Sequence, residues 1–119
     1  DLNGNNISDI SALAGLTNLY LLHLGGNNVS DVSVLAGLSD LQELGLNDSN
    51  ISDISALVGL MNLQELYLGR NNISDISSLL ANSGLSEGST VYLRGNPLNS
   101  TSVNDHIPQL EGKDVNVVY

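Results

Sequence analysis

Leucine recurs along this chain at a fixed interval of 22 residues. Four such leucine columns are present: Leu16, Leu38 and Leu60; Leu19, Leu41 and Leu63; Leu22, Leu44 and Leu66; and Leu24, Leu46 and Leu68. A polar motif with the same period, Asn-Ile/Val-Ser-Asp-Ile/Val, begins at Asn6, Asn28, Asn50 and Asn72. A fifth unit at 91–98 follows after 25 residues, because three residues are inserted between Leu79 and Val91. Self-similarity at this period indicates a stack of equivalent structural units.

Each unit contains one short alternating segment. Around Leu22-His23-Leu24, the two leucines fall on one face of an extended chain, and Leu21 and His23 fall on the other. The pattern predicts a strand of about three residues in each unit, with equivalents at 44–46, 66–68 and 91–93. Such strands would lie side by side at about 4.8 Å and form a parallel sheet.

The return segment of each unit begins at a Ser-Asp pair. The aspartate is expected to accept a hydrogen bond from a backbone N–H two or three residues later and so to start a short helical turn. A glycine follows in each of the first three units and is expected to take a left-handed conformation that ends the turn; these glycines are Gly15, Gly37 and Gly59. The spacing leaves room for a 3₁₀ or short α-turn, and a longer helix is predicted over 76–81, ending near Gly84.

The units are predicted to share one apolar interior. About seven side chains of the second unit point inward in this interpretation: Leu16, Leu19, Leu22, Leu24, Val29, Val32 and Leu35. Burying each of them contributes about 1.5–3 kcal/mol, whereas ordering the backbone costs about 1–2 kcal/mol per residue. A single unit therefore cannot fold alone, and stability has to come from the interfaces between units.

The repeated pattern L-x-x-L-x-L-x-x-N-x-I resembles that of leucine-rich repeats, in particular the short bacterial class to which the internalins belong. The resemblance implies an α/β solenoid over residues 1–98, with a parallel sheet on the concave face and 3₁₀ or short helical turns on the convex face. It also implies a ladder of buried asparagines between the units, at Asn5, Asn27, Asn71 and Asn96. Ser49 occupies the third position of this ladder, and it is expected to fill that position only in part.

The two ends of the stack differ in sequence. Residues 99–119 are predicted to form a C-terminal cap, with a short helix over 100–110 and a final strand through Val115, Val117 and Tyr119. Pro108 lacks a backbone N–H and interrupts the donor pattern of that helix, so the helix is expected to be kinked or brief. No such cap is apparent at the other end, where Leu2, Ile7, Ile10 and Leu13 are expected on an open surface. We therefore expect about five repeats that are truncated at the N-terminus, and an end capable of end-to-end self-association.

Composition narrows the function. The chain has 13 acidic and 3 basic residues, a net charge of −10, which opposes binding to nucleic acid. Apolar runs are too short for a membrane span, so no membrane insertion is expected. Cysteine is absent, which excludes disulfides and cysteine chemistry. The family resemblance implies a secreted or surface-displayed bacterial protein.

The outward positions of the predicted sheet are the ones that the repeat leaves free to vary. Two neighbouring tyrosines flanked by two arginines are typical of interface anchors. The candidate partner-binding residues on this face are Tyr67, Tyr92, Arg70, Arg94, Glu43, Glu65, His23 and Leu21. We therefore predict a module that binds a protein partner. The alternatives are a structural spacer or stalk without a ligand, and a carbohydrate-binding surface formed by the tyrosines.

Catalytic and metal-dependent functions are disfavoured. No nucleotide-binding loop, nucleophile elbow or zinc-protease motif occurs. The column Asp9, Asp31, Asp53 and Asp75 could attract calcium, but each aspartate already has a capping role, and no Asp-x-Asp-x-Asp loop is present. His23 could be a pH-sensitive contact or a weak metal ligand, although a solitary surface histidine is more often neither. The chain is therefore predicted to be non-catalytic, with no metal and no cofactor.

Overall fold

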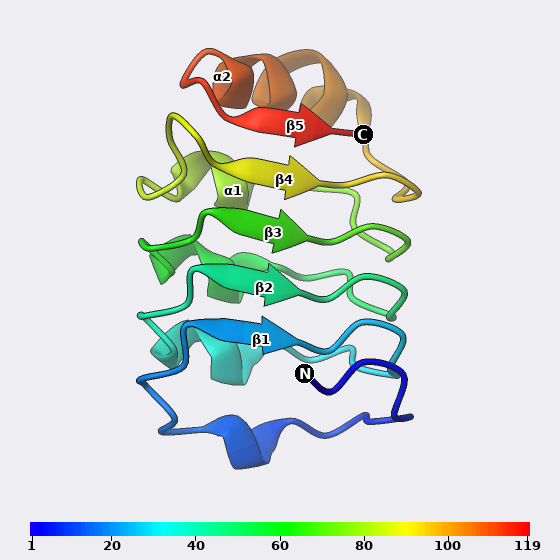
Figure 1. The fold of residues 1–119 in the computed structure, drawn as a ribbon. Helices are drawn as coiled ribbons and strands as arrows, with labels where there is room; N and C mark the ends of the chain where they lie inside the picture. The colour runs from blue at the N-terminus through cyan, green and yellow to red at the C-terminus, as the bar shows by residue number, and fades with distance from the viewer.

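The computed structural model describes all 119 residues, and its repeating units are stacked along one axis (Figure 1). The second to fifth units each add one strand to a five-stranded parallel sheet with the order β1-β2-β3-β4-β5, and the segment after the last repeat adds the fifth strand. The strand expected in the first unit is not formed, although its Leu2 N–H donates to His23 O of β1 at 2.8 Å. The strands are β1 (Leu21–His23), β2 (Glu43–Gly45), β3 (Glu65–Tyr67), β4 (Thr90–Tyr92) and β5 (Asn116–Val118). The predicted α/β solenoid with a parallel sheet is therefore confirmed, and β5 extends the sheet beyond the last repeat.

The strands pair without any shift in register. Leu22 lies opposite Leu44, Leu44 opposite Leu66, and Leu66 opposite Val91. All four side chains are buried, together with Val117 of β5. The inward column predicted from the repeat is thus continuous through the stack, and the residues one position to either side of it face outward. We refer to that outward face of the sheet as the concave face.

Short helical turns cover the other side of the core (Figure 1). Three are 3₁₀ turns, η1 (Ser11–Leu13), η2 (Ser33–Gly37) and η3 (Ser55–Gly59), and the fourth is the α-helix α1 (Ser77–Ala81). One aspartate precedes each turn and accepts the backbone N–H two residues later, at 2.8 Å from Ser11, 2.9 Å from Ser33, 2.8 Å from Ser55 and 2.7 Å from Ser77. These bonds lower the pKa of Asp9, Asp31, Asp53 and Asp75.

The predicted ends of these turns are correct only in the first unit. Gly15 has a φ of +83°, but Gly37 and Gly59 do not adopt positive φ and are the last residues of η2 and η3. There the turn is two residues longer than η1 and includes the glycine, so the glycine does not end it. Likewise α1 ends at Ala81 rather than near Gly84, because Asn82 takes an extended conformation with ψ of 109°.

The core is one continuous cluster of 27 buried apolar residues. Two predictions at the N-terminal unit are wrong. Leu16 is 48% exposed, whereas its equivalents Leu38 and Leu60 are fully buried, because these two have a neighbouring unit on each side and Leu16 has a unit on one side only. Conversely, Ile10 is buried although an open position was expected, and Ile7 and Leu13 are partly buried against the core.

Asparagine side chains tie consecutive units together behind the strands. The Asn27 amide donates to Leu2 O and Leu24 O, and its oxygen accepts the N–H groups of Asn5 and Ile7. In the later units, Asn71 and Asn96 likewise each donate to two leucine carbonyls, but each accepts only one backbone N–H, that of Ile51 or Ile73. At the corresponding third position, the Ser49 hydroxyl is buried and has no hydrogen-bond partner.

A helix over residues 100–111 lies across the C-terminal end of the stack (Figure 1). It contains a π-helical turn, η4 (Ser102–His106), followed by α2 (Ile107–Glu111), and it leads into β5. The wide turn comes directly before Pro108, which lacks an N–H and whose ring crowds the preceding turn. Ile107 and Leu110 are buried against the core, whereas Tyr119 is exposed. No helix of the structure has both the length and the apolar character required to cross a membrane.

Candidate functional site

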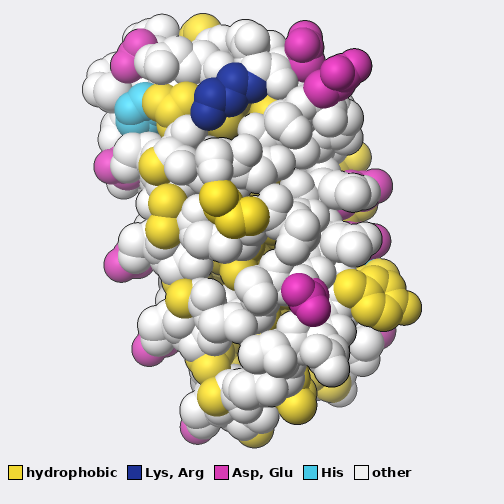
Figure 2. Space-filling view, turned by 90° about the vertical axis from the view of Figure 1, so that its left-hand side faces the viewer, with side chains coloured by type: hydrophobic (Ala, Val, Ile, Leu, Met, Phe, Trp, Pro, Cys, Tyr) yellow, Lys and Arg dark blue, Asp and Glu magenta, His cyan; other side chains and the backbone are white.

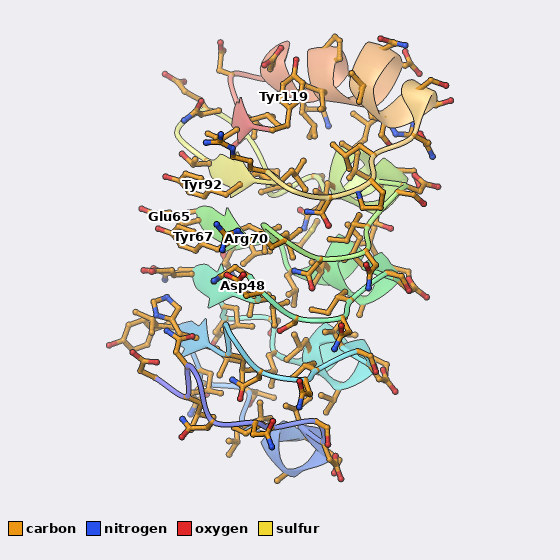
Figure 3. The ribbon with its side chains drawn as sticks, turned by 90° about the vertical axis from the view of Figure 1, so that its right-hand side faces the viewer. Asp48, Glu65, Tyr67, Arg70, Tyr92 and Tyr119 are labelled. Carbon is orange, nitrogen blue, oxygen red and sulfur yellow. The ribbon has the colours of Figure 1, made fainter.

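The predicted binding residues of the strands share the concave face. One outward row runs through Leu21, Glu43, Glu65, Thr90 and Asn116, and a second runs through His23, Gly45, Tyr67, Tyr92 and Val118. Figure 3 shows Glu65, Tyr67 and Tyr92 projecting from the sheet to the same side. Val118 was not among the predicted site residues. The alternation of Val115 and Val117 could have identified it, because a strand with those residues inward places Val118 outward beside Tyr92.

Three rings form a ridge along the second row, which we call the aromatic ridge (His23, Tyr67 and Tyr92). The Tyr67 and Tyr92 rings are stacked, with centroids 4.7 Å apart and planes 3° from parallel. On the β1 side of Tyr67, the His23 ring stands at 88° to it, with centroids 6.3 Å apart. The Tyr67 ring therefore has another ring on each side of it along the row.

Gly45 makes this arrangement possible. It lies between His23 and Tyr67 in the row, and a Cβ added to it would lie 2.9 Å from His23 Cδ2. Because that space is free, the imidazole can lean across β2 towards Tyr67. Sequence reasoning placed Gly45 in the outward row but did not identify this role, which depends on how two neighbouring side chains fill the gap.

Two carboxylates hold the ridge from the N-terminal side of the strands. Glu43 Oε1 lies 2.8 Å from His23 Nε2, and the Tyr67 hydroxyl donates a hydrogen bond to Glu65. That hydrogen bond raises the pKa of Tyr67 to about 12, since a phenolate would face the carboxylate instead of donating to it. The hydroxyl therefore stays protonated and keeps the ring fixed near neutral pH.

The two arginines lie beyond the C-terminal ends of the strands. They line a hollow of about 480 Å³, which we call the arginine hollow, formed by Asn47, Asp48, Gly69, Arg70, Arg94 and Gly95. Arg70 Nη1 lies 3.3 Å from Asp48 Oδ1, and Asn47 Nδ2 donates to Asp48 Oδ2 at 3.0 Å. The hydrogen bond from Asn47, with a further contribution from Arg70, lowers the pKa of Asp48. Figure 3 shows Asp48 and Arg70 next to each other at this end of the sheet.

Asp48 and Arg70 occupy a backbone position where other units have glycine. Their φ values are 51° and 53°, and the corresponding Gly4, Gly26 and Gly95 have φ of 67°, 66° and 82°. A left-handed conformation costs a residue with a Cβ roughly 1–2 kcal/mol. Sequence reasoning included Arg70 among the site residues but not Asp48, although their replacement of glycine in the repeat is a signal visible in the sequence.

The convex side carries the aspartate column, which is visible as a row of acidic side chains along one edge in Figure 2. A hollow of about 440 Å³ between η2 and η3 includes Asp31 and Asp53 in its lining. Each of these carboxylates accepts the N–H of its own turn. Nowhere in the chain do three or more His, Cys, Asp or Glu residues form a group that could hold a metal ion.

Comparison with known proteins is consistent with this architecture. The family model described as "Leucine Rich repeats (2 copies)" matches residues 1–37 and 39–82. Among curated proteins, no match to the chain is found. Among solved structures, an internalin (inlF) from Listeria monocytogenes is 33% identical with a TM-score of 0.81, and the match covers 96% of this chain and 34% of that one.

Two further structures are similar. An internalin C2 from Listeria monocytogenes is 30% identical with a TM-score of 0.80, over 96% of this chain and 47% of that one. A leucine-rich-repeat protein of Leptospira interrogans is 21% identical with a TM-score of 0.80, over 96% of this chain and 29% of that one. At this identity, the match supports the shared fold and nothing more. The chain therefore spans less than half the length of each of these proteins. On the family match, the repeat and the fold, the chain belongs to the leucine-rich-repeat family and is of the internalin-like kind.

Proposed function

We propose that this chain is a non-catalytic module that binds a protein partner on its concave face. The observation that supports the proposal most strongly is the stacked Tyr67–Tyr92 pair, which lies half-buried on the outer surface of the sheet and is fixed by the hydrogen bond to Glu65. The repeat requires apolar residues inward but leaves these outward positions open. The tyrosines are therefore not needed for the stack itself.

The physical properties of the aromatic ridge suit it to protein recognition. Tyrosine and arginine are enriched among the residues that contribute most to protein interfaces. Here the rings are already ordered by stacking and by the Glu43 and Glu65 contacts, so little side-chain entropy would be lost when a partner binds them. Concave faces of solenoids provide the extended surface that such partners need.

The geometry favours a protein over a carbohydrate. A sugar ring would stack on an exposed aromatic face, but Tyr67 lies between Tyr92 and His23, and Tyr92 has Val118 of β5 as its neighbour on the other side. The edges and hydroxyls that remain suit the mixed apolar and polar groups of a protein surface. A simple spacer or stalk would need neither the stacked pair nor the glycine that makes room for His23.

The proposed site of action is outside the cell, at the bacterial surface or after secretion. This follows from the similarity to the Listeria internalins. We also propose that the N-terminal unit associates with a second copy of the chain. Exposed Leu2 and Leu16 lie at that end. Sedimentation velocity over a range of concentrations tests this point, and a monomer at every concentration would contradict it.

The main test compares partner capture by three forms of the immobilised chain, using a mixture of extracellular proteins as the source of the partner. We expect the double variant Tyr67→Ala/Tyr92→Ala to lose the partner that the unchanged chain retains. Tyr20→Ala is the matched control, because Tyr20 is 64% exposed and lies outside the ridge. Equal capture by all three forms would refute the proposal, and a glycan-array signal lost only in the double variant would favour the carbohydrate alternative.

A further inference from the structure

The basic residues of the chain are concentrated in one place. The sequence has only three lysines and arginines and a net charge of −10. Two of the three, Arg70 and Arg94, line the arginine hollow, whereas Lys113 lies elsewhere and donates to Leu80 O. A local positive site in an acidic protein is the feature that the proposed function leaves unexplained.

The arginine hollow is open because two of its residues have no side chain. A Cβ on Gly95 would lie 3.1 Å from Arg70 Cγ, and a Cβ on Gly69 would lie 3.2 Å from Arg94 O. Arg70 therefore lies across the turn of the next unit, close to Arg94. None of the lining residues is hydrophobic, so the space suits a polar group rather than an apolar anchor.

The charges within the hollow do not cancel. Asp48 contacts Arg70 through one oxygen at 3.3 Å, and the Arg70 side chain remains 79% exposed. Arg94 is also exposed and forms no ion pair. One positive charge is thus left without a partner, and the planar guanidinium groups have donors suited to the two oxygens of a carboxylate.

We propose that the arginine hollow is a carboxylate-binding subsite, which takes an aspartate or glutamate side chain of the protein bound on the aromatic ridge. The proposal rests on the proposed function and adds the chemistry of one partner residue. Until the partner binds, Asp48 contacts one nitrogen, Nη1, of the Arg70 guanidinium group. The incoming carboxylate contacts Arg94 and the exposed donors of Arg70.

The test uses N-acetylglutamate amide as the probe and N-acetylglutamine amide as its neutral control, followed by NMR titration of the ¹⁵N-labelled chain. At about 0.15 M salt, charges more than about 8 Å away are largely screened, so the local site is measured rather than the net charge. We expect the carboxylate probe to shift the amide signals of Gly69 and Gly95, with a millimolar dissociation constant. The neutral probe should leave these signals unchanged.

Three variants sharpen the test. Arg94→Gln should weaken binding of the probe about tenfold, because a charge-assisted hydrogen bond is lost. Asp48→Asn should tighten it about threefold, because the competing carboxylate is removed. Lys113→Gln is the matched control, since it removes a positive charge outside the hollow and should leave binding unchanged.

Equal shifts with both probes, or an Asp48→Asn variant that binds no more tightly, would overturn the proposal. So would binding of inorganic phosphate at the same residues while the carboxylate probe causes no shift. The probe needs neither tyrosine of the ridge, so Tyr67→Ala/Tyr92→Ala should still bind it. A failure here is therefore distinguishable from a failure of partner capture on the ridge.

Discussion

Replacing Ser49 by asparagine should stabilise the protein, because it would complete the asparagine ladder. In the intact positions, Asn27 and Asn71 each donate to two carbonyls of consecutive units. Their oxygens accept backbone N–H groups, including that of Ile7 and that of Ile51. Val29 precedes Ser49 by 20 residues, just as Ile7 precedes Asn27 and Ile51 precedes Asn71, but the Ser49 hydroxyl makes no hydrogen bond.

The acceptors that a new amide would need are available. Leu24 O accepts Asn27 Nδ2, and Leu46 O accepts Asn71 Nδ2, which leaves each carbonyl able to take a second donor. Leu68 O already accepts from both Asn71 and Asn96, at 3.0 Å and 2.8 Å. The turn before position 49 also matches that of the next unit, since Asp48 and Arg70 have nearly equal φ values.

The expected gain can be worked out from these bonds. The introduced asparagine would add two donated hydrogen bonds and would accept one from Val29 N–H, as Asn71 accepts one from Ile51 N–H, at about 1 kcal/mol each. Ordering the longer side chain costs about 1–2 kcal/mol. The net increase in the free energy of unfolding is therefore about 1–2 kcal/mol. For a chain of this length, that corresponds to a rise in Tm of roughly 4–8 °C.

Urea and thermal unfolding followed by circular dichroism measure the effect. Ser49→Ala is the control: it removes the unpartnered hydroxyl without adding bonds, and should change the stability by less than about 0.5 kcal/mol. Asn71→Ser should be strongly destabilising, because it creates a second incomplete position. A Ser49→Asn variant with unchanged or lower stability would refute the reasoning, since it would mean that the third unit satisfies its backbone groups in some other way.

Two further predictions concern the convex side. Hydrogen bonds to the backbone lower the pKa of four aspartates in the folded state, namely Asp9, Asp31, Asp53 and Asp75. Their ionised carboxylates therefore stabilise the folded chain above the unfolded pKa of 3.8, and this stabilisation is lost as the pH falls through the folded pKa values. The free energy of unfolding should therefore decrease as the pH falls below about 5, and Asp53→Ala should reduce that decrease. The same slope in both proteins would contradict the prediction. Asn82→Ala should lower the free energy of unfolding in urea by about 2–4 kcal/mol, because the fully buried Asn82 amide donates to Leu57 O and Leu60 O. Asn62→Ala is the control: the exposed Asn62 amide donates to Ser39 O, and its loss should cost less than about 0.5 kcal/mol.

The sequence was sufficient to predict the stack and its register. A fixed period places Leu22, Leu44 and Leu66 at one level, and a slip of one residue would turn the leucines of a strand outward. The errors arise where a unit differs from the average of the repeat. Leu16 has the same place in the pattern as Leu38 but lacks a second neighbour, and Gly37 has the same place as Gly15 but lies in a turn that is two residues longer. Periodicity describes neither of these local differences.

The candidate site was predictable as a face but not as an arrangement. Alternation placed Glu43, Glu65, Tyr67 and Tyr92 outward without reference to any contact. The stacking of the rings, the lean of His23 over Gly45 and the Asp48–Arg70 pair depend on neighbours in the next unit and on a left-handed turn. A one-dimensional pattern gives the row in which a residue lies, but not how far its side chain reaches along the stack.

Two of the departures from the repeat lie in the same turn. The third unit has Asp48 in place of glycine and, directly after it, Ser49 in place of the ladder asparagine, so the turn that supplies Asp48 to the arginine hollow is also the turn with an unpartnered hydroxyl. Strain and lost stability of this kind are often found at functional sites. If the missing hydrogen bonds of this turn help the arginine hollow to bind a carboxylate, Ser49→Asn should raise the Tm and also weaken binding of N-acetylglutamate amide. The added hydrogen bonds would hold Asp48 against Arg70, where it competes with the incoming carboxylate. If the Tm rises and the affinity of the same variant stays unchanged, the missing asparagine is only a tolerated loss, and the link between the turn and the hollow is wrong.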